Sequence, residues 1–130
     1  NATSAGGPYY VIIQHRNHLR VQSNSALALT NVDPGAGGTY DFRLLSNIRG
    51  GGGVRMVGGG FVALAAGNTN EDNEVNAIDY IQVALSQDAS DEGYINTDVL
   101  FNSGNSNDVN GNDFLKIQDN SSIIFFSTVP

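Results

Sequence analysis

Residues 11–29, VIIQHRNHLRVQSNSALAL, carry the pattern that decides the predicted fold. Apolar and polar residues alternate within this stretch, so Leu19 and Val21 face one side of an extended chain and Arg20 and Gln22 face the other. Alternation interrupted by tight polar turns is typical of antiparallel hairpins. The triplets HRN and SNS divide the stretch into three predicted strands: Val11–His15, Leu19–Gln22 and Ala26–Thr30.

Later segments resemble this first unit. The segment VRMV-GGG-FVALA, from Val54 to Ala65, has the spacing of VIIQ-HRNH-LRVQ and predicts a second hairpin. A third unit is predicted from three further strands: Tyr94–Phe101, Phe114–Ile117 and Ile123–Ser127. Three units of about 40–45 residues, with four strands in a complete unit and the closing strand missing from the third, predict an all-β domain with the layout of a β-trefoil. A jelly-roll or another β-sandwich is the alternative architecture.

Glu71–Gln87 fits two interpretations. Val75, Ile78, Ile81 and Leu85 have helical spacing, whereas residues 81–86 alternate as a strand would. Similarity to YDFRLLS of the first unit favours two strands, Val75–Ile78 and Tyr80–Ser86. We therefore expect no helix longer than two turns.

The same alternation predicts which side chains form the core. The predicted core residues are Val11, Ile13, Leu19, Val21, Leu27, Leu29, Phe42, Leu44, Val54, Met56, Val62, Leu64, Ile81, Val83, Leu85, Leu100, Phe114 and Ile124.

The segments VIIQHRNHLRVQS, LALT and YDFRLLS together resemble one repeat of the fascin and hisactophilin type of β-trefoil protein. In that type of repeat a polar hairpin tip precedes a Leu-x-Val strand. The Gly-rich segment NVDPGAGGTY is similar to a loop of mushroom cysteine-protease inhibitors that share the fold. The resemblance implies a β-trefoil that binds its partner through loops.

Length and composition indicate a single domain spanning residues 1–130, with residues 1–8 as a loose leader. No apolar run approaches the roughly 20 residues of a membrane-spanning helix. The first residue is Asn1, and two Asn-x-Ser/Thr sequences are present, so we expect an extracellular, secreted protein. The net charge of −7 argues against nucleic acid as a partner.

The segment Asn107–Asp113 is the best candidate metal site in the sequence. It combines two carboxylates, several amide oxygens and a Gly bend, which are the features that calcium prefers. The predicted ligands are Asp108, Asn110, Asn112 and Asp113. We expect weak affinity, millimolar to high micromolar, because the loop has only two formal charges; a plain Asn/Gly turn is the alternative. No other cofactor is expected.

A carbohydrate site would use an aromatic face together with amide or carboxylate groups that fix hydroxyls. Tyr40, Asp41, Asn112 and Asp113 are the candidate ligand-binding residues. His15 and His18 would need a further ligand, for instance Asp41, to form a metal site.

No catalytic motif with a mechanism is found, so we expect no enzyme activity. The predicted function is a lectin-like extracellular binding module whose partner is a glycan or a protein surface. The alternatives are a protease inhibitor acting through Gly-rich loops and a structural, self-assembling β-protein subunit.

Overall fold

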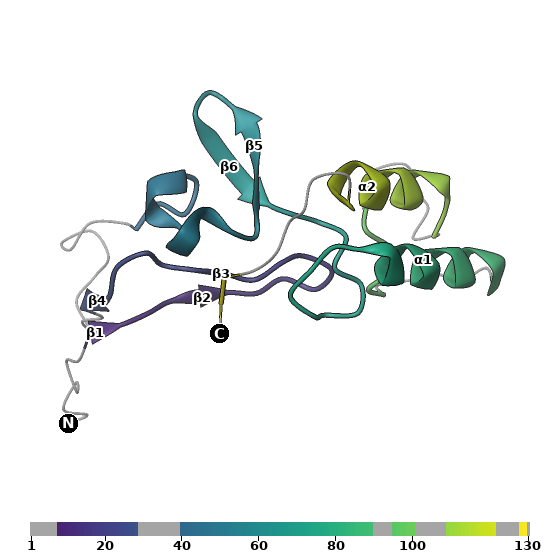
Figure 1. The fold of residues 1–130 in the computed structure, drawn as a ribbon, viewed down its shortest axis with the longest axis horizontal. Coiled ribbons are helices and arrows are strands. Elements are labelled where there is room, and N and C mark those ends of the chain that lie inside the picture. The colour runs from purple at the N-terminus through teal and green to yellow at the C-terminus, as the bar shows by residue number, and fades with distance from the viewer. Residues whose placement is uncertain (1–7, 29–39, 90–94, 101–108, 122–127, 130) are drawn as a thin grey trace.

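The computed structural model describes residues 8–28, 40–89, 95–100, 109–121 and 128–129. These residues form short strands, two 3₁₀ helices and two α-helices, with the β-structure at one end of the molecule and the α-helices at the other (Figure 1). In chain order the elements are β1 (Pro8–Tyr9), β2 (Ile12–Ile13), β3 (Val21–Gln22), β4 (Leu27–Ala28), η1 (Leu45–Asn47), η2 (Arg49–Gly51), β5 (Val54–Gly58), β6 (Phe61–Leu64), α1 (Ala77–Ala89) and α2 (Gly111–Ser121).

The stretch that opens the sequence forms a long, narrow ribbon. β2 and β3 pair antiparallel, with Ile13 opposite Val21, while β1 pairs with β4 further along the same ribbon. The turn between β2 and β3 lies at the far end of the ribbon, next to the α-helices (Figure 1). The hairpin predicted around HRN is therefore confirmed, and it connects the two ends of the molecule.

β5 and β6 form the second predicted hairpin, with Val54 opposite Leu64 and Met56 opposite Val62. Gly53, immediately before β5, has φ +77°, and a Cβ atom there would lie 2.6 Å from the Arg20 carbonyl oxygen. Only glycine tolerates both the left-handed backbone and this close approach, so Gly53 fixes where the hairpin leaves the ribbon.

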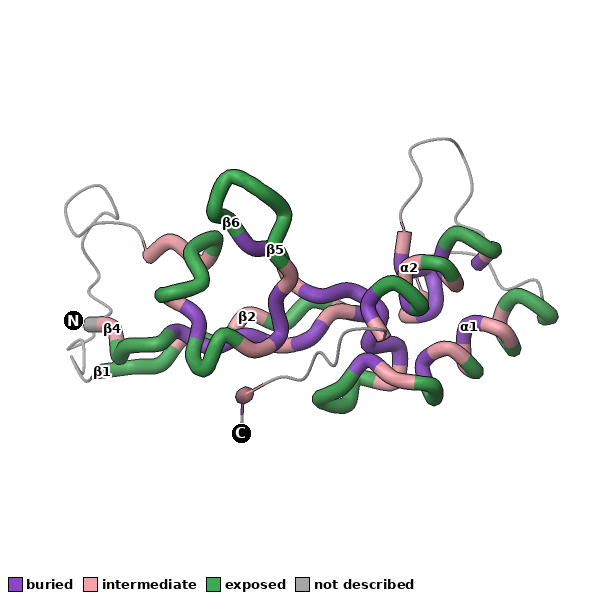
Figure 2. The backbone as a smooth tube through the Cα atoms, turned by 45° about the horizontal axis from the view of Figure 1, so that its top comes forward, coloured by how far each residue is buried: buried purple, intermediate pink, exposed green. Residues whose placement is uncertain are grey.

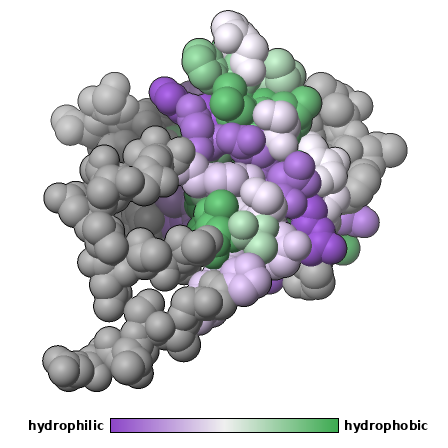
Figure 3. Space-filling model, turned by 90° about the vertical axis from the view of Figure 1, so that its left-hand side faces the viewer, coloured by the Kyte–Doolittle hydropathy of each residue, from purple (hydrophilic) through white to green (hydrophobic). Residues whose placement is uncertain are grey.

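The tip of the β5–β6 hairpin projects from the molecule, and the backbone there is exposed (Figure 2). Met56, Val57 and Phe61 are exposed on this hairpin. Figure 3 shows hydrophobic side chains gathered at the top of the molecule, where the hairpin projects in Figure 1.

Two clusters of buried side chains hold the described residues together. The first lies under the hairpin and contains Val21, Ile48, Val54 and Val62. The second lies between the helices and the ribbon and contains Leu19, Ala65, Ala66, Val75, Val83, Val99, Val109 and Ile117. Leu19 and Val21, two positions apart in the ribbon, thus contribute to different clusters and join them.

The prediction of an all-β fold is wrong. α1 and α2 have 13 and 11 residues, and the strands form three separate two-stranded sheets. Neither the four-strand units of a β-trefoil nor the packed sheets of a sandwich are present in the part of the chain that the structure describes.

The strands predicted within Glu71–Gln87 are likewise replaced by α1, which exceeds two helical turns. Ile81 and Leu85, expected in the core, are 55% and 64% exposed, whereas Val83 is fully buried. Burial of Asp79 and Val83 follows the four-residue helical period rather than the two-residue period of a strand. The predicted strand Phe114–Ile117 lies in α2 for the same reason, with Asp113 and Ile117 buried.

The core prediction is confirmed for Leu19, Val21, Val54, Val62 and Val83, which are all buried. It is wrong for Leu44, Met56, Ile81 and Leu85, which are exposed. Leu29 and Ile124, and the strand Ile123–Ser127, lie outside the described residues. None of the described helices is long and apolar enough to span a membrane.

Candidate cation-binding loops

The first candidate loop leads into α1 and is closed by a buried carboxylate. The Asn76 side chain accepts a hydrogen bond from the Ile78 N–H at 2.7 Å, and Asp79 accepts one from the Asn76 N–H at 2.8 Å. This reciprocal arrangement is a capping box, which satisfies N–H groups at the start of the helix. The other oxygen of Asp79 accepts hydrogen bonds from the N–H groups of Thr69 at 2.7 Å and Asn70 at 3.3 Å, so Asp79 also fixes the start of the loop.

The second candidate loop leads into α2 and is closed in the same way. The Asn110 side chain accepts from the Asn112 N–H at 2.9 Å, and Asp113 accepts from the Asn110 N–H at 3.0 Å. The other oxygen of Asp113 accepts from the N–H groups of Val99 at 2.8 Å and Leu100 at 2.7 Å. Asp79 and Asp113 are both fully buried.

These parallels reflect an internal repeat in the sequence. Val75-Asn76-x-x-Asp79-Tyr80-Ile81 is matched by Val109-Asn110-x-x-Asp113-Phe114-Leu115, and each matched pair is 34 positions apart (79 and 113, for example). The ring centroids of Tyr80 and Phe114, which are matched residues, lie 3.7 Å apart. Equivalent positions of the two loop–helix units are therefore in contact.

The repeat extends to the start of each loop. The N–H groups bound by the closing carboxylates belong to residues 69 and 70 in one loop and 99 and 100 in the other, an offset of 30. By the same offset Asn68 corresponds to Asp98. The starts of the two loops are 30 positions apart and their ends are 34 positions apart, so the second loop is four residues longer than the first.

Asn68 and Asp98 share an unusual property. They are 2% and 1% exposed, yet Oδ1 of Asn68 and both carboxylate oxygens of Asp98 have no hydrogen-bond partner. The Asn68 amide donates from Nδ2 to the Asp72 carbonyl at 2.7 Å, which places this amide inside its loop. Buried oxygens without a partner are costly, so a group that can bind oxygen is expected at both positions.

The Asp98 carboxylate has only partial electrostatic compensation. Burial, followed by the nearby charge of Asp113, raises its pKa, while Arg16 acts in the opposite direction. The nearest Arg16 nitrogen is 3.8 Å from Asp98 Oδ2, which is an ion pair without a close hydrogen bond. A cation near Asp98 would stabilise the ionised form.

The first loop has the ligand spacing of a known calcium loop. In an EF-hand, ligands come from positions 1, 3, 5, 7, 9 and 12 of a twelve-residue segment. Counting from Asn68 as position 1, these positions are Asn68, Asn70, Asp72, Glu74, Asn76 and Asp79. The loop departs from the EF-hand in having Asp rather than Glu at position 12 and Asn73 rather than Gly at position 6. An extended segment, not a helix, also precedes the loop.

Charge around the loops is strongly unbalanced. Residues 56–115 contain ten Asp and Glu residues and no Lys or Arg. Among the described residues no three His, Cys, Asp or Glu side chains gather as a metal centre, so a bound cation would rely largely on amide and carbonyl oxygens. Such hard, mixed oxygen sets suit calcium.

Three of the four metal ligands predicted from the sequence lie at the start of α2. Asp113 closes the second loop, Asn110 caps the helix, and Asn112 is exposed. Asp108 lies outside the described residues. The structure therefore brings Asn110 and Asp113 together. It adds Asp98 and the whole first loop, neither of which was predicted. The repeated Val-Asn-x-x-Asp pattern would have pointed to the first loop, whereas Asp98 stands out only by its burial without a hydrogen-bond partner.

The four residues predicted to bind carbohydrate are not brought together. Tyr40 donates to the Asn47 carbonyl at 2.6 Å, beside η1, while Asn112 and Asp113 begin α2 at the opposite end of the molecule (Figure 1). Asp41 is held by Arg43 at 2.8 Å, and the hydrogen bond from that guanidinium lowers the Asp41 pKa to about 2.

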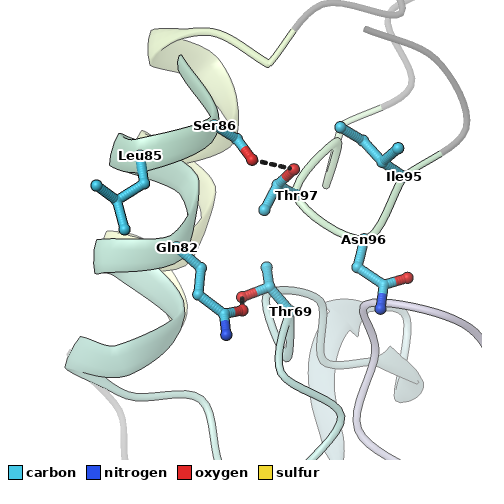
Figure 4. Close-up of a pocket in the computed structure, with 7 residues that line it drawn as sticks. All are labelled: Thr69, Gln82, Leu85, Ser86, Ile95, Asn96 and Thr97. Atoms are coloured by element: carbon cyan, nitrogen blue, oxygen red, sulfur yellow. Dashed lines mark hydrogen bonds between the residues drawn. The ribbon is translucent and has the colours of Figure 1, made fainter. Parts of the chain in front are cut away.

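A pocket of about 550 Å³ lies beside the first loop (Figure 4). It is lined by Thr69, Gln82, Leu85, Ser86, Ile95, Asn96 and Thr97. Thr97 donates to Ser86 at 3.0 Å and Thr69 donates to Gln82 at 2.7 Å, so these polar groups satisfy one another. The lining has no aromatic face for a sugar ring, and carbohydrate binding remains a prediction.

His15 and His18 face each other, with their Nδ1 atoms 3.0 Å apart. Burial, together with the charge of His15, lowers the pKa of His18. The second histidine also contacts the Asn17 side chain at 2.8 Å, so it supports the turn of the ribbon.

Comparison with protein-family models, curated proteins and solved structures found no match for this chain.

Proposed function

We propose that the chain is a non-enzymatic, calcium-stabilised module in which two related loop–helix units each hold one divalent cation. The first loop would bind through Asn68, Asn70, Asp72 and Asp79. The second loop would bind its cation through Asp98 and Asp113, with Asn110 as a further ligand.

One observation carries the proposal. Asn68 and Asp98 occupy the equivalent first position of the two loops, and both are buried with side-chain oxygens that have no hydrogen-bond partner. A buried carboxylate or amide oxygen without a partner costs roughly 1–3 kcal/mol or more. That this cost recurs at equivalent positions of a repeat supports a common ligand rather than an isolated packing defect.

The donor set supports weak binding and an extracellular setting. Both loops combine few carboxylates with neutral amide oxygens, and calcium affinity falls as the number of charged ligands falls. Extracellular modules bind calcium at about 10⁻⁴–10⁻³ M, the range expected for such loops. In this role calcium would hold the helical end of the module in shape for contact with a protein or glycan partner.

The test is thermal unfolding in about 10 mM calcium chloride, in magnesium chloride and in chelator with matched ionic strength. Calcium at 10 to 100 times its dissociation constant should stabilise the folded state by about 1.4–2.7 kcal/mol per site. The parent should therefore melt several degrees higher in calcium than in chelator. Magnesium should have a smaller effect because it demands stricter octahedral geometry.

Asp72→Asn and Asp98→Asn should each remove part of the calcium-dependent shift. Asp88→Asn is the matched control, because Asp88 is an exposed carboxylate of α1 outside both loops. Equal melting temperatures of the parent in calcium and chelator would refute the proposal. A shift that survives both loop substitutions would place the cation elsewhere in the chain.

A further inference from the structure

The turn of the N-terminal ribbon is inserted between the two candidate loops. Asn17, at the tip of this turn, is 2% exposed and has φ +46°, a left-handed conformation that asparagine tolerates better than most residues. The ribbon reaches the helical end of the molecule at this point, as Figure 1 shows.

Asn17 is bonded to both loops. Its backbone carbonyl accepts hydrogen bonds from the N–H groups of Gly67 at 2.7 Å and Asn68 at 3.1 Å. Its side-chain Nδ2 donates to the Asp98 carbonyl at 2.6 Å. Asn68 and Asp98 are the two residues with unpartnered buried oxygens, so one residue of the ribbon joins the first position of one loop to the first position of the other.

The surroundings of Asn17 hold it in place. The Leu19 N–H donates to the Ala65 carbonyl at 2.9 Å, and His18 forms an isolated bridge with Ala66. These contacts attach the ribbon to the segment that leads into the first loop. The first residues of the two loops are therefore joined through Asn17, by its backbone carbonyl on one side and by its side-chain amide on the other.

We infer that Asn17 is a positioning residue that couples the two loops, so that a cation bound in one raises the affinity of the other. This inference rests on the proposed function. A cation at Asn68 fixes the Asn68 N–H, which donates a hydrogen bond to the Asn17 carbonyl. The Asn17 side chain in turn fixes the Asp98 carbonyl, to which it donates. The position of the Asp98 backbone is then already fixed when the second cation binds, which lowers the ordering cost at this residue. By linkage the effect is reciprocal.

The experiment is calorimetric titration with calcium chloride. The coupling factor is the calcium affinity of the first loop in the parent divided by its affinity when Asp98→Asn disables the second loop. We expect this factor to be at least about 5 in the parent, the lower end of the usual range for coupled sites. In the Asn17→Gly background it should fall to about 1, because glycine keeps the left-handed turn and the backbone acceptor but removes the bond to Asp98.

Asn24→Gly is the matched control. The Asn24 side chain also donates to a backbone carbonyl, that of Ser46 at 3.1 Å, but in a part of the ribbon remote from both loops. This variant should keep the coupling factor of the parent. Asn17→Asp is a second test, because aspartate tolerates the same backbone conformation and lacks the donor, and it should also abolish the coupling.

The outcomes separate the two claims. A coupling factor that survives Asn17→Gly and Asn17→Asp would overturn this inference and leave the proposed function standing. A parent that binds no calcium would overturn both. Variants at Asn17 that stay unfolded even in calcium would show that Asn17 supports the whole fold, and would also overturn the specific coupling role.

Discussion

Leu19 is a fully buried residue of the ribbon. It belongs to the cluster of buried side chains that includes Val83 of α1 and Ile117 of α2. We predict that Leu19→Ala lowers the free energy of unfolding by roughly 2–5 kcal/mol, the range for a large side chain removed from a core. Urea unfolding monitored by far-ultraviolet dichroism measures this change.

Met56→Ala is the natural control for Leu19→Ala. Met56 alternates in the sequence as a core residue would, yet it is 56% exposed on the hairpin. Its truncation should cost under about 0.5 kcal/mol. Similar losses for the two variants would contradict the assignment of the core.

Asp98 yields a pH-dependent prediction. Burial raises the pKa of the Asp98 carboxyl group above the ordinary 3.8. The folded protein therefore binds the proton of this carboxyl group more tightly than the unfolded chain does. Its contribution to stability is therefore full below about pH 3.8, and it is lost as the pH rises through the raised pKa. At neutral pH and without calcium, the ionised carboxylate destabilises the fold.

Asp98→Asn should consequently be more stable than the parent in chelator at about pH 7, because an amide carries no charge for burial to disfavour. The difference should vanish at about pH 3.5, where the parent carboxyl is protonated too. In calcium the order should reverse, because the substitution removes a charged ligand. Melting curves at the two pH values check the first part, and a variant less stable than the parent in chelator at about pH 7 would contradict it.

α1 and α2 each begin with a buried aspartate that closes the preceding loop. Substitution of either aspartate should lower the free energy of unfolding by a similar amount. Asp79 and Asp113 each accept hydrogen bonds from the backbone on both sides of a loop. Replacing either carboxylate by an amide keeps one acceptor oxygen and puts an NH2 group at the other position, so at least one backbone N–H of each loop loses its acceptor. We predict that Asp79→Asn and Asp113→Asn each cost roughly 2–4 kcal/mol, measured in calcium by urea unfolding.

Asp88→Asn should leave stability within about 0.5 kcal/mol, because Asp88 is exposed. A large loss for only one of the two closing residues would show that the loops are not equivalent.

At the level of elements, the sequence predicts hairpins well and helices badly. The β2–β3 and β5–β6 hairpins follow from alternation around short polar or glycine turns, which is a local signal. In Tyr80–Ser86 alternation was misleading, because Ile81 and Leu85 are exposed apolar residues that imitate a strand face. The stronger signal for α1 was Asn76 followed three residues later by Asp79. This pair forms a capping box in which Asn and Asp replace the more common Ser and Glu.

For the whole molecule, the asymmetric charge has a structural counterpart. The arginines lie within the first 57 residues and carry a local excess of +3, whereas the remainder carries −10. Three of them reach the acidic half: Arg16 approaches Asp98, Arg20 binds Asn73, and Arg55 binds Asn120. Of these three contacts only that of Arg16 joins opposite charges, since Asn73 and Asn120 are neutral. The charge imbalance therefore supports the proposal of a bound cation.

The candidate site was only partly predictable from the sequence. Asn110 and Asp113 were found because oxygen-bearing residues and glycine are concentrated near them. Asn68 and Asp98 could not be found in this way, since their importance comes from burial without a hydrogen-bond partner, and burial depends on the tertiary contacts of Asn17. The second loop was also obscured by its four additional residues, which break the repeat.

The most direct test is the number of calcium ions bound per chain, counted by equilibrium dialysis at about 10 mM free calcium, which is about 10 to 100 times the expected dissociation constants. We expect two ions for the parent, one for Asp72→Asn, one for Asp98→Asn and two for Asp88→Asn. A parent that binds no calcium above the level of a scrambled acidic peptide of equal charge would contradict the proposed function.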